Sequence, residues 1–196
     1  MEHRGAPPGK ALKYARAELE RRFLLARAPE GPCVRRSAIT DLYVTGTRLR
    51  LRRAVETTAS GSTISRKFTQ KIPAPSGAPG LITTMYLDEA EHSVLSGLPG
   101  SGLTKTRYSV PPFGVDVFSG NLAGLLMAEV EFENAEEGKH FQVPADVIAE
   151  VTADPRLSGG RLALTRRNEL VTLLAEFGLE PLDASELASR SLVAPR

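Results

Sequence analysis

The sequence predicts an α+β protein in which eight antiparallel strands close into a β-barrel around a tunnel, with flanking helices and a C-terminal helix. Two observations favour this fold: short segments alternate apolar and polar residues with period two, and turns rich in glycine and proline separate them. Helical spacing of apolar residues appears mainly late in the chain, which places helices around a sheet or barrel. The expected strands cover residues 17–25, 39–44, 47–52, 63–72, 103–110, 114–118 and 125–132.

The segments between these strands predict loops and helices. Residues 28–32 and 73–80 are rich in proline and glycine and predict loops. Residues 86–98 predict the end of a strand followed by a short helix. Residues 160–177 space their leucines as an amphipathic helix does, which gives the expected C-terminal helix.

Composition and charge restrict the functional class. The chain has 196 residues, 41% hydrophobic and 24% charged, which fits one ordinary globular domain. The formal net charge of +2 is too small for a protein that binds long nucleic acids through charge alone. Cys33 is the only cysteine, so neither an intrachain disulfide nor a thiolate metal cluster can form. Without a secretory signal or a bilayer-spanning apolar run, we expect a cytoplasmic protein with no membrane partner.

Charged residues on the predicted strands fall on one shared face. In any one strand taken alone, a face exposed to water explains them equally well. Taken together, at least five strands carry charge on one face and apolar groups on the other. If helices cover the apolar faces, the charged faces converge inside the barrel, which has room for side chains or one small ligand. The charged set is Glu18, Glu20, Arg22, Arg48, Arg50, Arg52, Lys67, Lys71, Lys105, Arg107, Asp116, Glu129 and Glu131.

This set mixes bases with carboxylates, and each kind predicts a ligand. Two like charges about 4 Å apart repel by roughly 4 kcal/mol at an effective dielectric of about 20, so the converging bases need an anion. Arginine and lysine side chains bind phosphate oxygens, which predicts a polyphosphate. The carboxylates would repel it unless a divalent metal such as Mg²⁺ or Mn²⁺ bridges the two. Glu18 with Glu20, and Glu129 with Glu131, face the same way in pairs and predict the metal cradle.

Six short motifs follow one another along the chain. They are Glu18-Leu19-Glu20-Arg21-Arg22, Arg48-Leu49-Arg50-Leu51-Arg52, Thr69-Gln70-Lys71, Lys105-Thr106-Arg107, Asp116-Val117-Phe118 and Ala128-Glu129-Val130-Glu131. By these motifs, residues 14–178 resemble the CYTH domain, or triphosphate tunnel metalloenzyme, family. Residues 1–13 are then expected to form a flexible N-terminal tail, and residues 179–196 a C-terminal extension.

The resemblance implies a tunnel that binds a triphosphate or polyphosphate and hydrolyses it with Mg²⁺ or Mn²⁺, by in-line attack on a phosphoryl group. The substrate-binding residues would be Arg48, Arg50, Arg52, Lys67, Lys71, Lys105 and Arg107. The metal would be held by Glu18, Glu20, Asp116, Glu129 and Glu131. The catalytic residues would be Glu18, Glu20 and Arg22, with the glutamates also able to orient the attacking water.

Arg22 departs from the family pattern, which has a lysine at this position. Arginine keeps the charge but cannot lend a proton near neutral pH, so the departure bears on rate and substrate choice. The leading hypothesis is a metal-dependent triphosphatase acting on inorganic tripolyphosphate or a related short polyphosphate. The alternatives are an adenylate cyclase or a nucleotide or thiamine triphosphatase of the same family, and a non-catalytic polyphosphate-binding protein. The sequence leaves the oligomeric state open, a homodimer included.

Overall fold

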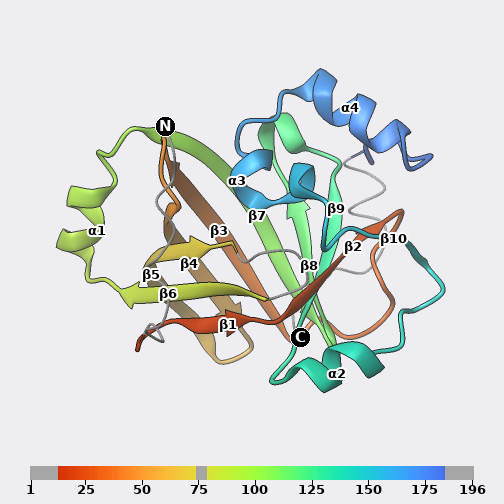
Figure 1. Ribbon diagram of the computed structural model, residues 1–196, viewed down its shortest axis with the longest axis horizontal. Coiled ribbons are helices and arrows are strands. Elements are labelled where there is room, and N and C mark those ends of the chain that lie inside the picture. Colours follow the sequence, from red (N-terminus) through yellow and green to blue (C-terminus); the bar gives the residue numbers. More distant parts are fainter. Residues whose placement is uncertain (1–12, 74–78, 184–196) are drawn as a thin grey trace.

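The computed structural model describes residues 13–73 and 79–183, which form one antiparallel β-sheet with a few short helices (Figure 1). The sheet of these described residues contains β1 (Arg16–Glu18), β2 (Glu20–Leu25), β3 (Arg35–Val44), β4 (Leu49–Thr58), β5 (Gly61–Ile72), β6 (Gly80–Tyr86), β7 (Gly100–Val110), β8 (Phe113–Phe118), β9 (Leu126–Glu131) and β10 (Val147–Glu150). Their spatial order is β1-β6-β5-β4-β3-β7-β8-β9-β2-β10. The prediction of a mainly antiparallel sheet with few helices is confirmed.

The prediction of a closed eight-stranded barrel is wrong, because the sheet has ten strands in the described residues and its order does not close. One cause lies at Leu19. Residues up to Glu18 pair with β6, whereas residues from Glu20 onward pair with β9, so the predicted first strand is two strands. β10 adds a further strand beside β2, with an irregular register. The polypeptide at Leu19, rather than a closing ladder, therefore connects the β6 side of the sheet to the β9 side.

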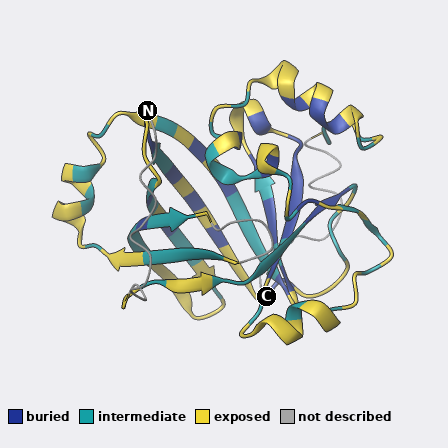
Figure 2. Cartoon of the chain, viewed as in Figure 1, coloured by how far each residue is buried: buried dark blue, intermediate teal, exposed yellow. Residues whose placement is uncertain are grey.

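The two faces of the central strands differ in burial as the period-two pattern predicts. Along β3, alternate residues are buried and exposed: Ser37, Ile39 and Asp41 are buried, and Arg36, Ala38 and Thr40 are exposed. The ladders place Asp41 opposite Arg52 of β4 and Leu103 of β7, so these residues share the inner face. The expectation that helices cover the outer faces fails at β3, whose outer face is open to water (Figure 2).

Two helices close one end of the inner face. α3 (Gly159–Leu162) and α4 (Arg167–Ala175) pack their leucines against inner-face residues of the sheet in one hydrophobic cluster. The cluster includes Leu24, Leu103, Phe118, Met127, Leu162, Leu170, Leu173 and Leu174. The predicted helix over residues 160–177 is thus confirmed in place but divided in two. The Glu169 side chain accepts the Arg166 N–H, 2.8 Å away, and so caps the start of α4. Leu164, which lies between α3 and α4, is 59% exposed.

The other helices are short. α1 (Glu89–Leu95) confirms the helix expected within residues 86–98, and it begins at a capping box between Asp88 and Glu91. The sequence pattern did not predict α2 (Ala135–His140), β10 or the 3₁₀ turn η2 (Pro155–Leu157). No helix of the described residues is long and apolar enough to cross a membrane. The predicted tail (1–13) and extension (179–196) lie outside the described residues, apart from residues 13 and 179–183.

Candidate functional site

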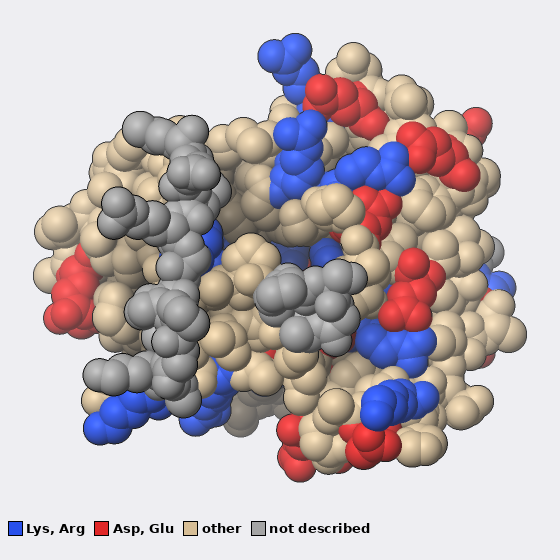
Figure 3. All heavy atoms as spheres, in the orientation of Figure 1, with Lys and Arg blue, Asp and Glu red and all other residues tan. Residues whose placement is uncertain are grey.

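A cavity of about 1040 Å³ lies against the inner face of the sheet. Charged side chains from β1, β2, β4, β7 and β9 line much of it, and residues 155–162 close one end. Basic side chains are visible inside the hollow at the centre of the face shown in Figure 3. The volume is at the upper end of the range of about 300–1,000 Å³ for small-molecule sites, so a ligand could enter with ions and water.

Three arginines line the β3–β4 side of the cavity, and a fully buried aspartate outside the lining pairs with two of them. We call this group the arginine wall (Asp41, Arg48, Arg50 and Arg52). Arg50 and Arg52 stand two residues apart on β4, so both point inward. Arg52 donates from Nε and Nη2 to the two oxygens of Asp41, each at 2.7 Å. Arg50 Nε lies 3.9 Å from Asp41 Oδ1, and this buried nitrogen has no hydrogen-bond partner among the described residues. With one carboxylate among three arginines, this wall keeps an excess of positive charge.

The pKa values on β3 follow from this arrangement. Burial would raise the pKa of Asp41, but the hydrogen bonds and charge of Arg52, together with the charge of Arg50, lower it below its usual value. Burial and the charge of Asp41 raise the pKa of Tyr43, the next inward residue of the strand. Near neutral pH, Asp41 is therefore ionised and Tyr43 is protonated.

The β7–β9 side carries as many carboxylates as bases, and we call it the paired wall (Lys105, Arg107, Asp116 and Glu129). The fully buried carboxylate of Asp116 accepts from Lys105 Nζ, and from Arg107 Nε and Nη2 at 2.7 and 2.6 Å. Arg107 also donates to Glu129. Burial would raise the pKa of Glu129, but the charges of Lys105 and Arg107 lower it well below its usual range. The protein itself therefore already neutralises the bases of this wall.

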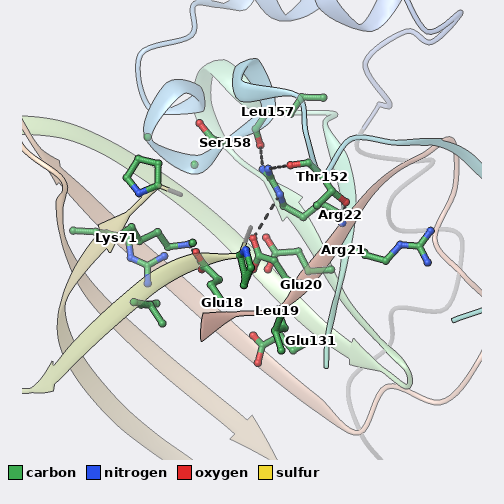
Figure 4. Close-up of a pocket in the computed structure, with 18 of the residues that line it drawn as sticks. Glu18, Leu19, Glu20, Arg21, Arg22, Lys71, Glu131, Thr152, Leu157 and Ser158 are labelled. Atoms are coloured by element: carbon green, nitrogen blue, oxygen red, sulfur yellow. Dashed lines mark hydrogen bonds and ion pairs between the residues drawn. The ribbon is translucent and has the colours of Figure 1, made fainter. Parts of the chain in front are cut away.

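Glu18 and Glu20 reach the cavity from the two sides of Leu19 (Figure 4). Glu18 accepts a hydrogen bond from Lys71 Nζ. Burial, and next the charge of Glu129, raise the pKa of Glu20 to about 6. Glu131 pairs with Glu20 across the β2–β9 ladder and lines the same cavity, although its side chain is exposed. These neighbouring carboxylates repel one another, so a cation between them would be stabilising.

Arg22 lines the cavity but is bound to the segment that closes its end (Figure 4). Its Nη1 donates to the Leu157 carbonyl and its Nη2 to the Thr152 carbonyl, both at 2.7 Å. Its backbone N–H donates to Thr152 Oγ1 at 2.9 Å. Only Nε faces Glu20, at 3.5 Å from Oε1. The guanidinium therefore connects β2 to the loop before α3, and its terminal nitrogens already have partners.

The cavity brings together most of the charged residues that the sequence predicted. Those in its lining are Glu18, Glu20, Arg22, Arg48, Arg50, Arg52, Lys71, Lys105, Arg107, Glu129 and Glu131. Two predicted residues do not reach it. The Lys67 ammonium lies over the Tyr86 ring, 5.2 Å from its centroid. Asp116 is buried beneath Lys105 and Arg107.

Sequence reasoning missed three residues that shape the site: Asp41, Tyr43 and Thr152. Asp41 carried a signal, since it is a charged residue at an inward position of a strand that is otherwise largely apolar. Tyr43 shares its face, and its hydroxyl packs against Gly159 so closely that a Cβ there would lie 2.0 Å from the oxygen. The contact of Thr152 with Arg22 could not be predicted from the sequence, because the two positions are 130 residues apart in the chain.

The carboxylates suit a divalent cation in their chemistry. Among the described residues, no three His, Cys, Asp or Glu side chains are grouped closely enough to form a ready-made metal site. Mg²⁺, however, is usually held by one or two carboxylates together with substrate phosphates and water. Glu20, whose pKa is raised beside Glu129 and Glu18, offers oxygen ligands of that kind. The residues therefore fit a cation that binds together with an anionic substrate.

The fold and site define a mainly antiparallel β protein with a cavity of mixed charge. Comparison with known proteins then identifies its relatives. The chain is 30% identical over 160 residues to the inorganic triphosphatase of Nitrosomonas europaea, covering 76% of this chain and 97% of that protein. The chain belongs to the family of that triphosphatase. No family model matches it.

Solved structures give weaker likenesses. The crystal structure of the inorganic triphosphatase NE1496 matches with 26% identity and a TM-score of 0.48, over 76% of this chain and 95% of that chain. The PH1819 protein from Pyrococcus horikoshii OT3 matches with 16% identity and a TM-score of 0.44, over 85% and 93%. Because both TM-scores lie below 0.5, the family membership rests on the sequence relationship.

Proposed function

We propose that the protein is a triphosphate tunnel metalloenzyme of the CYTH type, which hydrolyses inorganic tripolyphosphate or a related short polyphosphate with Mg²⁺ or Mn²⁺. The observation that carries the proposal is the arginine wall, where Arg48, Arg50 and Arg52 line a large cavity and the buried carboxylate of Asp41 pairs with only two of them, Arg50 and Arg52. Membership of an inorganic triphosphatase family supports the same reaction.

The phosphate chain would lie along the arginine wall. Arg48, Arg50 and Arg52 would donate to its oxygens, and Arg50, with its unpartnered buried Nε, has the most to gain from an anion. Lys71 would contribute once Glu18 exchanges its bond to this lysine for a cation. Lys105 and Arg107 would contribute less to phosphate binding, because Asp116 and Glu129 already neutralise them.

Glu18, Glu20, Glu129 and Glu131 would hold the cation. When bound, Mg²⁺ or Mn²⁺ would neutralise charge on the phosphate oxygens and increase the acidity of a bound water. Glu20, with a pKa of about 6, is suited to orient the attacking water and to accept hydrogen bonds from it. Arg22 would act on the reaction through Glu20, since Nε is its nitrogen nearest that carboxylate.

In the reaction, the oxygen of water would form a bond to the terminal phosphorus and the bridging P–O bond would break. Orthophosphate and pyrophosphate would result, and the water proton would leave with a product or with Glu20. The arginines would stabilise the charge that moves onto the leaving oxygen. The buried setting strengthens this stabilisation, because the same charges interact more strongly away from bulk water.

One observation favours the alternative of an organic triphosphate. The end of the cavity near α3 is apolar, lined by Leu103, Phe118, Met127, Leu157 and Leu162. A nucleotide or thiamine group could pack there while its phosphates reach the arginine wall.

The lone buried thiol of Cys33 supports a cytoplasmic location, which stays a prediction.

The test is the release of orthophosphate from tripolyphosphate by the purified protein, with Mg²⁺, Mn²⁺ or EDTA. We expect release with one of the metals and none in EDTA, and slower release from ATP and thiamine triphosphate. Cyclic AMP formed from ATP, or faster hydrolysis of an organic triphosphate, would support that alternative instead. Tight tripolyphosphate binding without release under any divalent metal would show a binding protein and overturn the enzyme proposal.

A further inference from the structure

Asp41 lies at the centre of the arginine wall and belongs to none of the six motifs. It is in the middle of β3, opposite Arg52 of β4, and its side chain has no exposed surface. A carboxylate in a site for a polyanion is unfavourable in charge alone, because it repels phosphate oxygens. Its presence therefore calls for a reason other than direct contact with the ligand.

The contacts of Asp41 fix the orientation of an arginine. Arg52 donates to it through two parallel hydrogen bonds, from Nε and Nη2 at 2.7 Å each. A two-point bond of this kind sets the plane of the guanidinium as well as its position. The other edge of the guanidinium, with Nη1, is then left for a ligand. The same Asp41 Oδ1 lies 3.9 Å from Arg50 Nε and so attracts the second arginine of β4.

Fold stability alone does not explain the burial of this pair, because removing two charges from water costs about as much as their attraction returns. Held in advance, however, the arginines avoid losing side-chain freedom when a ligand binds. We propose that Asp41 is a positioning residue, which holds Arg52, and through its charge Arg50, ready to bind the phosphates of the substrate. This inference rests on the proposed function and adds to it a residue that acts without touching the substrate.

A positioning role and a purely electrostatic role for Asp41 predict opposite changes in polyanion affinity for Asp41→Asn. If Asp41 only offsets positive charge, removing its charge makes the cavity more positive and a polyanion binds more tightly. If it positions Arg52, the arginine must be immobilised on binding and the polyanion binds more weakly. The expected loss is about tenfold in affinity, on the order of the cost of ordering one long side chain.

The experiment measures binding of inorganic tripolyphosphate by calorimetry in EDTA, where neither turnover nor a metal contributes. We expect Asp41→Asn to raise the Kd about tenfold. In a chain that already carries Arg52→Met, the same change should lose most of its effect, because Asp41 acts mainly through its two hydrogen bonds to Arg52 and only through charge on Arg50. If Asp41 had only a structural role, Asp41→Asn would weaken tripolyphosphate binding equally in the wild-type and Arg52→Met proteins. Should Asp41→Asn not fold, Asp41→Glu keeps the charge but displaces the carboxylate, and the same weakening is expected.

Asp154→Asn is the matched control. Asp154 also accepts from Nε and Nη2 of an arginine, Arg156, but it does so outside the cavity lining. Asparagine can replace it as the cap of η2, so tripolyphosphate affinity should stay within about twofold. Unchanged or tighter binding by Asp41→Asn, with a wild type that binds, overturns the positioning role alone. A wild type that binds no tripolyphosphate overturns the proposed function and this inference together.

Discussion

The two walls of the cavity use similar residues in different proportions. On the arginine wall, Asp41 is one carboxylate among Arg48, Arg50 and Arg52. On the paired wall, Asp116 and Glu129 neutralise Lys105 and Arg107 through short hydrogen bonds. The inward bases of a strand therefore do not all have the same capacity for an anion. That capacity depends on how many carboxylates the neighbouring strands place beside them. Under the proposed function, phosphates would therefore bind beside β4 and the cation beside β2 and β9.

The largest expected effect concerns the stability of the paired wall. Asp116→Asn removes the acceptor that Lys105 and Arg107 share in the interior. Breaking a buried ion pair on one side costs about 3–5 kcal/mol, and we expect a loss of this size in the free energy of unfolding. Urea unfolding near neutral pH measures it.

Glu136→Gln is the control, because the Glu136–Lys139 pair is 68% exposed on both sides. It should change stability by less than about 1 kcal/mol. If Asp116→Asn cost no more than this control, the bases of the paired wall would not depend on Asp116, and the contrast between the walls would fail.

The next effect concerns the arginine wall and activity. Arg50→Met keeps much of the side chain's length but removes the charge whose Nε lacks a partner. Loss of charge-assisted hydrogen bonds to phosphate should cost about 2 kcal/mol of transition-state stabilisation. This corresponds to a roughly 30-fold lower kcat/KM for tripolyphosphate. Steady-state phosphate release measures it. Arg53→Met, on the exposed face of the same strand, should leave kcat/KM nearly unchanged, and equal losses in both variants would contradict the assignment.

A smaller effect is expected where β2 binds the end of the cavity. Arg21 and Arg22 are adjacent but point in opposite directions (Figure 4). Arg22 donates to the carbonyls of Thr152 and Leu157, and Arg21 to those of Gly138 and Phe141. Arg21 also donates from Nε and Nη2 to the Glu150 carboxylate. The donors of a lysine sit on one nitrogen and lack the planar fork of a guanidinium, so lysine cannot reproduce either set of contacts, and each Arg→Lys change should cost about 1–2 kcal/mol locally.

Amide hydrogen exchange separates the two changes. Arg22→Lys should speed exchange in residues 151–158, whereas Arg21→Lys should speed it in residues 138–141. Each variant serves as the control for the other. Faster exchange in the same segment for both would show general loosening and not two separate attachments.

The sequence predicted which charged side chains share a cavity better than it predicted the closure of the sheet. The alternation of β4, β7 and β9 was enough to bring Arg50, Lys105 and Glu129 to one cavity, because period two fixes which face a residue takes. The change of partner at Leu19 could not be predicted, since it depends on which distant strands pair with each side of that residue. The same limit applies to Asp116, whose inward direction was right but whose burial depends on its neighbours.

The central claim is that phosphates bind the arginine wall and that the cation binds beside Glu20. Calorimetric titration of tripolyphosphate into Arg50→Met and Glu20→Gln, each in EDTA and in Mg²⁺, tests it directly. We expect Arg50→Met to lose affinity already in EDTA. Glu20→Gln should keep the wild-type affinity in EDTA, or exceed it, and lose the gain that Mg²⁺ gives the wild type. Equal losses by both variants in EDTA, or a full Mg²⁺ gain in Glu20→Gln, would contradict the division of the cavity into a phosphate side and a cation side.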